Sequence, residues 1–252
     1  QLLMEFLAEA LAKSGAPDRG RGVVNLVQGG ADIASALVTH RDLDGILFTG
    51  SWPVGRRILE SNLDNPGRIV ALEMGGNNAA VVMDDADIRQ AVIEVVRCAF
   101  NTTGQRCTCT RRVIVHETVA DHFLRAACEC ASRLVVNSPR ANEPVFMGPI
   151  ISEAARDAVL AFQSKARKAD AQIVLESQKL KVSRTGTDGW YLSPGVMLVD
   201  RFNSAPAGKA FDPGCDEEVF GPLLRMTTVE SLDEAIEQTN ATRFGLAASI
   251  FT

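Results

Sequence analysis

The sequence predicts an α/β protein built on parallel, doubly wound sheet, and two observations predict it. Helix-like and strand-like patterns alternate along the chain, as a parallel sheet with crossover helices requires. Several of the short apolar runs also end in glycine, which is typical of the turn that leads from a strand into the next helix.

The first 75 residues show the alternation clearly. Residues 1–13 carry apolar side chains at helical spacing, and Gly15 is suited to end that helix. A helix is expected at 31–40 and another after Ser51, which can serve as its N-cap, with Pro53 in the first turn. Short apolar runs predict strands at 22–30, 45–50 and 68–76.

A second unit is expected to begin at the Gly75-Gly76 pair, so we divide the chain into residues 1–75 and 76–252 and expect doubly wound sheet in each. The helices predicted in the second unit span 87–100, 119–135, 152–169 and 231–242. The predicted strands span 79–83, 111–116, 172–176, 195–200, 218–229 and 246–251, with a turn-rich excursion at 181–195.

Composition and charge exclude several classes of protein. With 252 residues, 46% of them hydrophobic and 23% charged, the chain is typical of a globular protein with a sizeable core. A net charge of −5 with interspersed signs argues against nucleic acid or a membrane surface as partner. No apolar run approaches the roughly 18 residues of a membrane span. Glu5 and Glu9 interrupt the N-terminal apolar pattern, unlike a secretory signal. We therefore expect a cytoplasmic location.

The six cysteines are expected to be free thiols in a reducing compartment. The pairs Cys107/Cys109 and Cys128/Cys130 lack the usual zinc-ligand spacing, and no histidine lies near either pair, so no metal site is predicted. Because the sequence does not begin with methionine and stops in an apolar, strand-like run, we expect an internal segment of a longer protein.

Two short motifs lie where predicted strands end. In "FTGSWPVG", Gly50 ends a strand and Gly55 lies in the first turn of a helix, whose N-terminus suits a phosphate group. Tight turns also use glycine for geometry alone, so this spacing is a weak signal. In "LEMGGNN", Glu73 ends a strand beside two glycines, where a site in an α/β protein can open. A solvated or capping glutamate is the simpler interpretation of Glu73.

Two further motifs lie in predicted loops. In "GQRC", Arg106 precedes Cys107, and a nearby cation favours a reactive thiolate. A buried structural cysteine is the simpler alternative. In "DEEVFGPLL", Glu217 and Glu218 stand together before an apolar run, and paired carboxylates are usually solvated.

Taken together and in order, these four boxes resemble the aldehyde dehydrogenase superfamily over essentially all 252 residues. The matching boxes are G-S-x-x-x-G, E-x-G-G, G-Q-x-C and E-E-x-F-G-P, and their spacings agree as well. The resemblance implies that residues 1–75 are the C-terminal half of an NAD-binding domain. It implies that residues 76–252 are a thiol-bearing catalytic domain, incomplete at its C-terminus, within a homo-oligomeric parent protein.

The resemblance also implies a role for each motif. Cys107 would be the nucleophile that forms a thiohemiacetal and then a thioester, with its own backbone N–H as one oxyanion donor. Glu73 would be the general base for thioester hydrolysis. The remaining residues would hold NAD: Glu218 at the nicotinamide ribose, Phe220 beside the nicotinamide, and Gly50, Ser51 and Gly55 near the pyrophosphate. NADP is not excluded, because the residues that discriminate the two lie upstream in the family.

Finer features favour one subgroup of the family, which oxidises a semialdehyde that carries two carboxylates. The doubled Asn77-Asn78 marks this subgroup, because most relatives have lysine at the first position. Arg106 is our candidate for binding the substrate carboxylates, and a surface ion pair is its simpler interpretation. The alternatives are a dehydrogenase for another semialdehyde and a non-catalytic protein of this fold. A panel of semialdehydes and thiol labelling of Cys107 would separate them.

Overall fold

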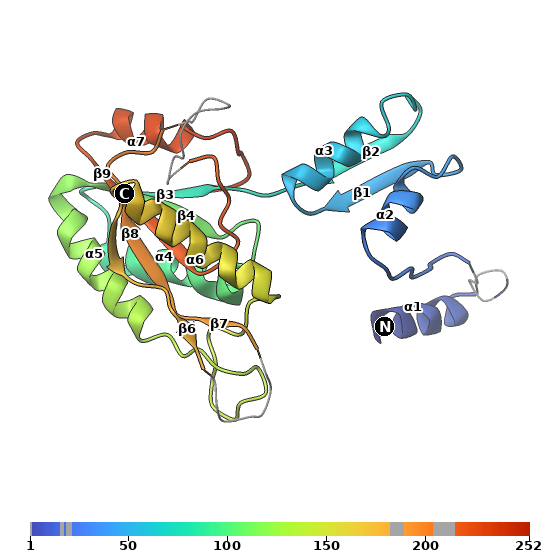
Figure 1. Cartoon of the computed structure of the whole chain (residues 1–252), viewed down its shortest axis with the longest axis horizontal. Helices are drawn as coiled ribbons and strands as arrows, with labels where there is room; N and C mark the ends of the chain where they lie inside the picture. Colours follow the sequence, from blue (N-terminus) through green and yellow to red (C-terminus); the bar gives the residue numbers. More distant parts are fainter. Residues whose placement is uncertain (1, 16–17, 19–21, 182–188, 204–214) are drawn as a thin grey trace. The chain divides into compact units, whose positions relative to one another are not determined.

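The computed structural model describes residues 2–15, 18, 22–181, 189–203 and 215–252 (Figure 1). The chain divides into two compact units, Gln1–Met74 and Gly75–Thr252. The division falls one residue before the boundary expected from the sequence. Each unit has its own sheet, so each is described by itself.

The described part of the first unit contains three α-helices and a two-stranded parallel sheet. The helices are α1 (Leu2–Lys13), α2 (Ala31–Val38) and α3 (Trp52–Glu60), as predicted, and Gly15 has the positive φ of +76° that suits a helix stop. The strands are β1 (Gly45–Thr49) and β2 (Ile69–Glu73), which pair in parallel from Gly45 opposite Ile69.

The strand predicted at 22–30 is wrong. Those residues form turns and irregular chain, and their apolar side chains are exposed. A strand needs a neighbour for its backbone groups. Among the described residues of the first unit, β1 and β2 pair only with each other, so the apolar run at 22–30 has no strand to join.

The second unit is a six-stranded sheet with the strand order β10-β3-β4-β9-β8-β5. All neighbouring strands are parallel except β5, which runs antiparallel to β8 at the edge. The strands are β3 (Asn78–Val82), β4 (Thr110–His116), β5 (Gln172–Leu175), β8 (Gly195–Leu198), β9 (Leu223–Val229) and β10 (Ala248–Phe251).

Helices cover both faces of this sheet, as the doubly wound prediction requires. The helices are α4 (Ile88–Phe100), α5 (Glu117–Ser132), α6 (Glu153–Lys168) and α7 (Leu232–Asn240). One buried cluster joins α4 and α5 to the side of β4 that carries Val113 and Val115, and another joins α6 and α7 to the side that carries Ile114. Successive strand residues point to opposite faces, so one apolar strand serves both cores. The α/β class is confirmed.

Two details differ from the sequence prediction. The antiparallel edge strand β5 departs from a fully parallel sheet. The strand predicted at 218–229 begins only at Leu223, because Pro222 has no N–H for a sheet ladder and Glu218 makes side-chain contacts in the loop before it. The turn-rich excursion lies partly outside the described residues, and its described flanks form the small antiparallel pair β6 (Lys179–Leu180) and β7 (Tyr191–Leu192).

Three parallel strands at the centre of the second unit begin at the same edge. In the sheet, β3, β4 and β9 are adjacent, and parallel strands start side by side. The chain segments directly before them are Gly75–Asn77, Asn101–Cys109 and Glu217–Pro222; the first holds the two glycines of the E-x-G-G motif, and the other two hold the G-Q-x-C and E-E-x-F-G-P motifs. The fold therefore brings three distant parts of the sequence to one place.

No helix in the described part of the chain is long and apolar enough to cross a membrane.

Replacing the capping residue of α6 tests the local basis of this fold. The Ser152 hydroxyl accepts a hydrogen bond from the Ala155 N–H at 3.1 Å. We expect Ser152→Ala to lower the free energy of unfolding by about 1 kcal/mol, because an N-cap bond is lost. Urea denaturation measures the change. The control is Ser132→Ala, which removes an exposed hydroxyl at the end of α5 and should cost about 0.5 kcal/mol or less. Equal losses would contradict the capping role.

Candidate active site

The candidate nucleophile lies in a tightly constrained loop between α4 and β4. The loop opens with the 3₁₀ turn Asn101–Gly104, in which Thr102, Thr103 and Gly104 have φ angles of +54°, +58° and +69°. Residues other than glycine rarely adopt this left-handed conformation, since Cβ then crowds the backbone. Two consecutive threonines in it persist only where neighbouring groups hold them.

Side-chain hydrogen bonds stabilise this left-handed backbone conformation. The Thr103 hydroxyl donates to the Gly148 carbonyl at 3.0 Å. The Gln105 amide donates to the Pro149 carbonyl at 3.2 Å and accepts from the Ile151 N–H at 2.9 Å. Gly104 packs so closely against the loop before β9 that a Cβ there would lie 2.2 Å from the Gly221 carbonyl oxygen. The positions before Cys107 are therefore fixed on two sides.

Asn78 holds the loop on the other side of the nucleophile. Its Nδ2 donates to the carbonyls of Cys107 and Cys109, at 2.7 and 2.8 Å. Its Oδ1 accepts from the Ala247 N–H at 3.0 Å. Asn78 is buried at the start of β3, so it ties the nucleophile loop to the chain that leads into β10.

The two cysteines of the loop differ in environment. Cys107 is half-buried, whereas Cys109 is only 1% exposed. Burial raises the pKa of the Cys109 thiol, and the nearby Arg111 only partly offsets this. A thiol that stays protonated is a poor nucleophile. Cys107 is thus the more accessible thiol, and Cys109 has the features of a structural residue. In the described part of the chain, no three His, Cys, Asp or Glu side chains gather as a metal site would need.

A buried ion pair links the nucleophile loop to the predicted cofactor segment. Arg111, on β4, is 1% exposed, and its Nη2 lies 3.1 Å from Oε1 of Glu218, whose side chain is 17% exposed. The same carboxylate oxygen accepts the Gly76 N–H at 3.2 Å. A Cβ at Gly75 would lie 1.9 Å from Glu218 Oε2, so a larger residue at this position would displace the carboxylate from its present place. The guanidinium carbon of Arg111 lies 5.2 Å from the centre of the Phe220 ring.

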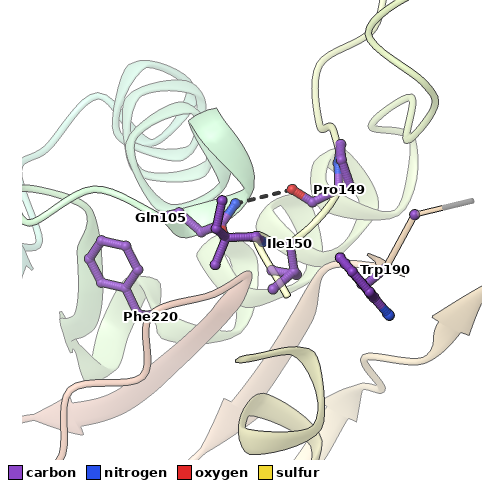
Figure 2. A pocket seen from close by; sticks show the side chains of 7 residues that line it. Gln105, Pro149, Ile150, Trp190 and Phe220 are labelled. Atoms are coloured by element: carbon purple, nitrogen blue, oxygen red, sulfur yellow. Dashed lines mark hydrogen bonds between the residues drawn. The ribbon is translucent and has the colours of Figure 1, made fainter. Parts of the chain in front are cut away.

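An open hollow of about 500 Å³ lies beside the nucleophile loop (Figure 2). In Figure 2, Phe220 lies on one side of Gln105 and Ile150, and Trp190 lies on the other. The lining residues are Gln105, Pro149, Ile150, Ile151, Gly189, Trp190 and Phe220. None of these described residues is charged, and the Gln105 amide is already bonded to Pro149 and Ile151, so this part of the lining suits a flat or apolar group better than a carboxylate.

The first unit gathers the other predicted residues at the carboxyl ends of its two strands. The Gly50 N–H donates to the Glu73 carbonyl at 2.9 Å, and the Gly55 N–H donates to the Ser51 carbonyl at 3.0 Å. Ser51 is the N-cap of α3, but its hydroxyl makes no bond to the helix N–H groups. Glu73 is exposed at the end of β2. This arrangement presents the N-terminus of α3, whose free N–H groups suit an anion, beside the exposed Glu73 carboxylate.

The three arginines near Cys107 have different surroundings. Arg106 is exposed, and it makes no ion pair with the described residues. Arg111 and Arg112 point to opposite faces of β4, as alternation requires. Arg112 donates to the carbonyls of Gln238 and Thr239, at 2.8 and 2.9 Å. Arg111 instead turns toward Glu218, a contact that sequence reasoning missed. The sequence signal for this contact was the presence of two arginines, Arg111 and Arg112, in the otherwise apolar strand β4.

The second unit is thus an α/β domain with helices on both faces of its sheet and with Cys107 half-buried in a hydrogen-bonded loop before β4. The aldehyde dehydrogenase family model matches residues 1–252. The chain therefore belongs to the aldehyde dehydrogenase family.

Similar proteins agree with this assignment. The chain is 37% identical over 244 residues to the N-succinylglutamate 5-semialdehyde dehydrogenase of Sphingopyxis alaskensis, with 97% of the chain and 47% of the relative covered. It is 39% identical over 249 residues to N-succinylglutamate 5-semialdehyde dehydrogenase 1 of Caulobacter vibrioides, with 98% and 49% covered. The chain thus spans about half the length of these curated relatives.

A solved structure resembles the whole chain. Betaine aldehyde dehydrogenase from Staphylococcus aureus, in complex with NAD⁺, superimposes with a TM-score of 0.87 at 26% identity. The superposition covers 100% of this chain and 46% of that protein.

The contrast between the two loop cysteines predicts selective labelling. We expect iodoacetamide at neutral pH to alkylate Cys107 in the folded chain and to leave Cys109 unmodified, because Cys109 is buried and its pKa is raised. Tandem mass spectrometry can assign the label within the tryptic peptide that holds both. Exposed Cys98 is the positive control, and unfolding in urea should release Cys109. Equal labelling of both in the folded chain would contradict the geometry.

Proposed function

We propose that the whole protein is an NAD-dependent aldehyde dehydrogenase that oxidises N-succinylglutamate 5-semialdehyde to N-succinylglutamate. The observation that carries this proposal is the loop around Cys107, in which hydrogen bonds hold the chain on both sides of an accessible thiol. Family membership and the names of the relatives support the same reaction. A dehydrogenase for another semialdehyde is the alternative, and rates on a panel of semialdehydes test it.

Cys107 would begin the reaction by attack on the aldehyde carbon. Its thiolate forms a C–S bond, and negative charge develops on the former carbonyl oxygen. The backbone N–H of Cys107 is suited to stabilise that charge, because hydrogen bonds on both sides of Cys107 keep the loop in place. Glu73 would accept a proton from the water that cleaves the thioester formed later.

The residues present fit NAD as the cofactor. Bound NAD supplies an acceptor for the hydride that the aldehyde carbon loses. In the second unit, Glu218 offers a carboxylate for ribose hydroxyls, and Phe220 flanks an apolar hollow that suits the nicotinamide ring. In the first unit, Gly50, Ser51 and Gly55 lie at the N-terminus of α3, where N–H groups suit the pyrophosphate.

Substrate charge gives Arg106 a role in this proposal. N-succinylglutamate 5-semialdehyde carries two carboxylates, which need cationic or N–H partners. Among the described residues, none that lines the hollow beside Gln105 is charged. Exposed Arg106, next to the nucleophile, is therefore our candidate for binding one substrate carboxylate.

Removing the thiol tests the nucleophile. We expect Cys107→Ala in the whole protein to abolish dehydrogenase activity and to leave NAD affinity nearly unchanged, because the thiol is needed for the covalent step and not for cofactor binding. Steady-state rates and calorimetric titration with NAD measure the two effects. Cys109→Ala is the matched control and should keep most of the activity. Retention of more than a few per cent of kcat in Cys107→Ala would contradict the proposal that Cys107 is the nucleophile.

Neutralising Arg106 tests the substrate site. We expect Arg106→Gln to lower kcat/KM for the dicarboxylate semialdehyde about tenfold to a hundredfold, since a charge-assisted hydrogen bond contributes roughly 1.5–3 kcal/mol. An uncharged aldehyde of similar length should lose much less. Equal losses for both substrates would mean that Arg106 acts on the thiol alone, and no loss for either would leave it a surface residue.

A further inference from the structure

Arg111 contacts all three loops that converge before β3, β4 and β9. We propose that Arg111 is a positioning residue, which sets the nucleophile loop against the cofactor carboxylate and strengthens the oxyanion donor. This inference rests on the proposed function, which gives Cys107 and Glu218 their roles.

The guanidinium of Arg111 donates hydrogen bonds to three backbone carbonyls. One belongs to the segment before β3, and two belong to the loop before β4, one of them next to Cys107. Nε lies 3.2 Å from the Gly76 oxygen, Nη1 3.1 Å from the Gly104 oxygen and Nη2 2.8 Å from the Arg106 oxygen. With Glu218, four acceptors surround one side chain that is 1% exposed. Because the guanidinium is a rigid, planar fork, these contacts fix the loops relative to one another.

The bond to the Arg106 carbonyl acts directly on the nucleophile's own peptide group. The C=O of Arg106 and the N–H of Cys107 belong to one planar trans peptide unit and point in opposite directions. A cation that donates to the oxygen polarises this unit, and hydrogen bonds in such a chain strengthen each other. Arg111 therefore aims the Cys107 N–H away from itself and makes it a better donor to the developing oxyanion.

The same guanidinium orients the candidate cofactor carboxylate. Glu218 Oε1 is bonded to both Arg111 and the Gly76 N–H, so the carboxylate plane cannot rotate freely. The Phe220 ring lies over the guanidinium carbon, which couples the position of that ring to Arg111 as well. One side chain thus fixes the relative placement of the groups proposed to bind cofactor and those proposed to do chemistry.

Arg112 is a matched comparison for Arg111. It is equally buried and adjacent on β4, but it donates hydrogen bonds to the Asn77 carbonyl and, in α7, to the carbonyls of Gln238 and Thr239. None of these acceptors flanks Cys107. Replacing each arginine by lysine keeps the charge and removes the fork, so the two variants separate a positioning role from a merely structural one.

The experiment compares Arg111→Lys and Arg112→Lys in the whole protein. For Arg111→Lys we expect kcat to fall about tenfold to a hundredfold and NAD to bind more weakly, because charge-assisted bonds to the loop and through Glu218 are lost. Deuterium uptake in residues 101–110 should rise. Arg112→Lys should lower stability to urea and leave these three readouts within about twofold of wild type.

Chemical rescue gives an independent test. Arg111→Ala leaves a cavity of guanidinium shape, and millimolar guanidinium should restore part of kcat in the folded variant. Folded Arg111 variants with wild-type kcat, NAD affinity and deuterium uptake would overturn the proposal, as would equal effects from Arg112→Lys. Failure of the proposed function is distinguishable, since wild-type protein would then show no NAD-dependent oxidation. Even if wild-type protein showed no such activity, unchanged deuterium uptake at residues 101–110 in Arg111→Lys would overturn the positioning role.

Discussion

The ion pair between Arg111 and Glu218 is the interaction on which the candidate site of the second unit depends. Taking two charges out of water costs several kcal/mol per ion, and their attraction repays this only when further hydrogen bonds complete the geometry. Here three backbone carbonyls and one backbone N–H complete it. Such a pair adds little net stability, but loss of one partner leaves the other buried without its counter-charge. It therefore selects one arrangement of the loops and rejects others.

The fold explains why distant motifs meet at this pair. Ligands of doubly wound proteins usually lie at the carboxyl ends of the strands, and the candidate residues Gly50 and Glu73 of the first unit lie at such ends. In the second unit the motifs come before β3, β4 and β9, at the amino ends of adjacent parallel strands. The first unit thus offers a helix N-terminus for an anion, whereas the second offers a thiol and a carboxylate in loops that lead into the sheet.

Much of this could be predicted from the sequence, for identifiable reasons. The helices have strong apolar periodicity and local caps, such as Asp87, which accepts the Gln90 N–H at the start of α4. The central strands β3 and β4 are buried on both faces, and their sequences contain apolar runs. The prediction of a strand at 22–30 was wrong because the local sequence does not specify which strand a segment pairs with. The antiparallel direction of β5 was missed for the same reason. Contacts over long sequence separations, such as Arg111 with Glu218, depend on strand order, which periodicity does not reveal.

Asn77 also accepts hydrogen bonds from buried arginines, outside the loops that flank Cys107. Its backbone carbonyl accepts from Arg112 at 2.8 Å, and its side-chain oxygen accepts from Arg225 at 2.5 Å. Its amide nitrogen donates to the Cys215 carbonyl. A lysine, common at this position in the family, has donors but no acceptor, and it would bring a third cation to two buried guanidiniums. An asparagine can satisfy donors and acceptors at once. Asn77 and Arg225 are therefore matched to one another, because the Asn77 oxygen supplies an acceptor that a lysine at this position would lack.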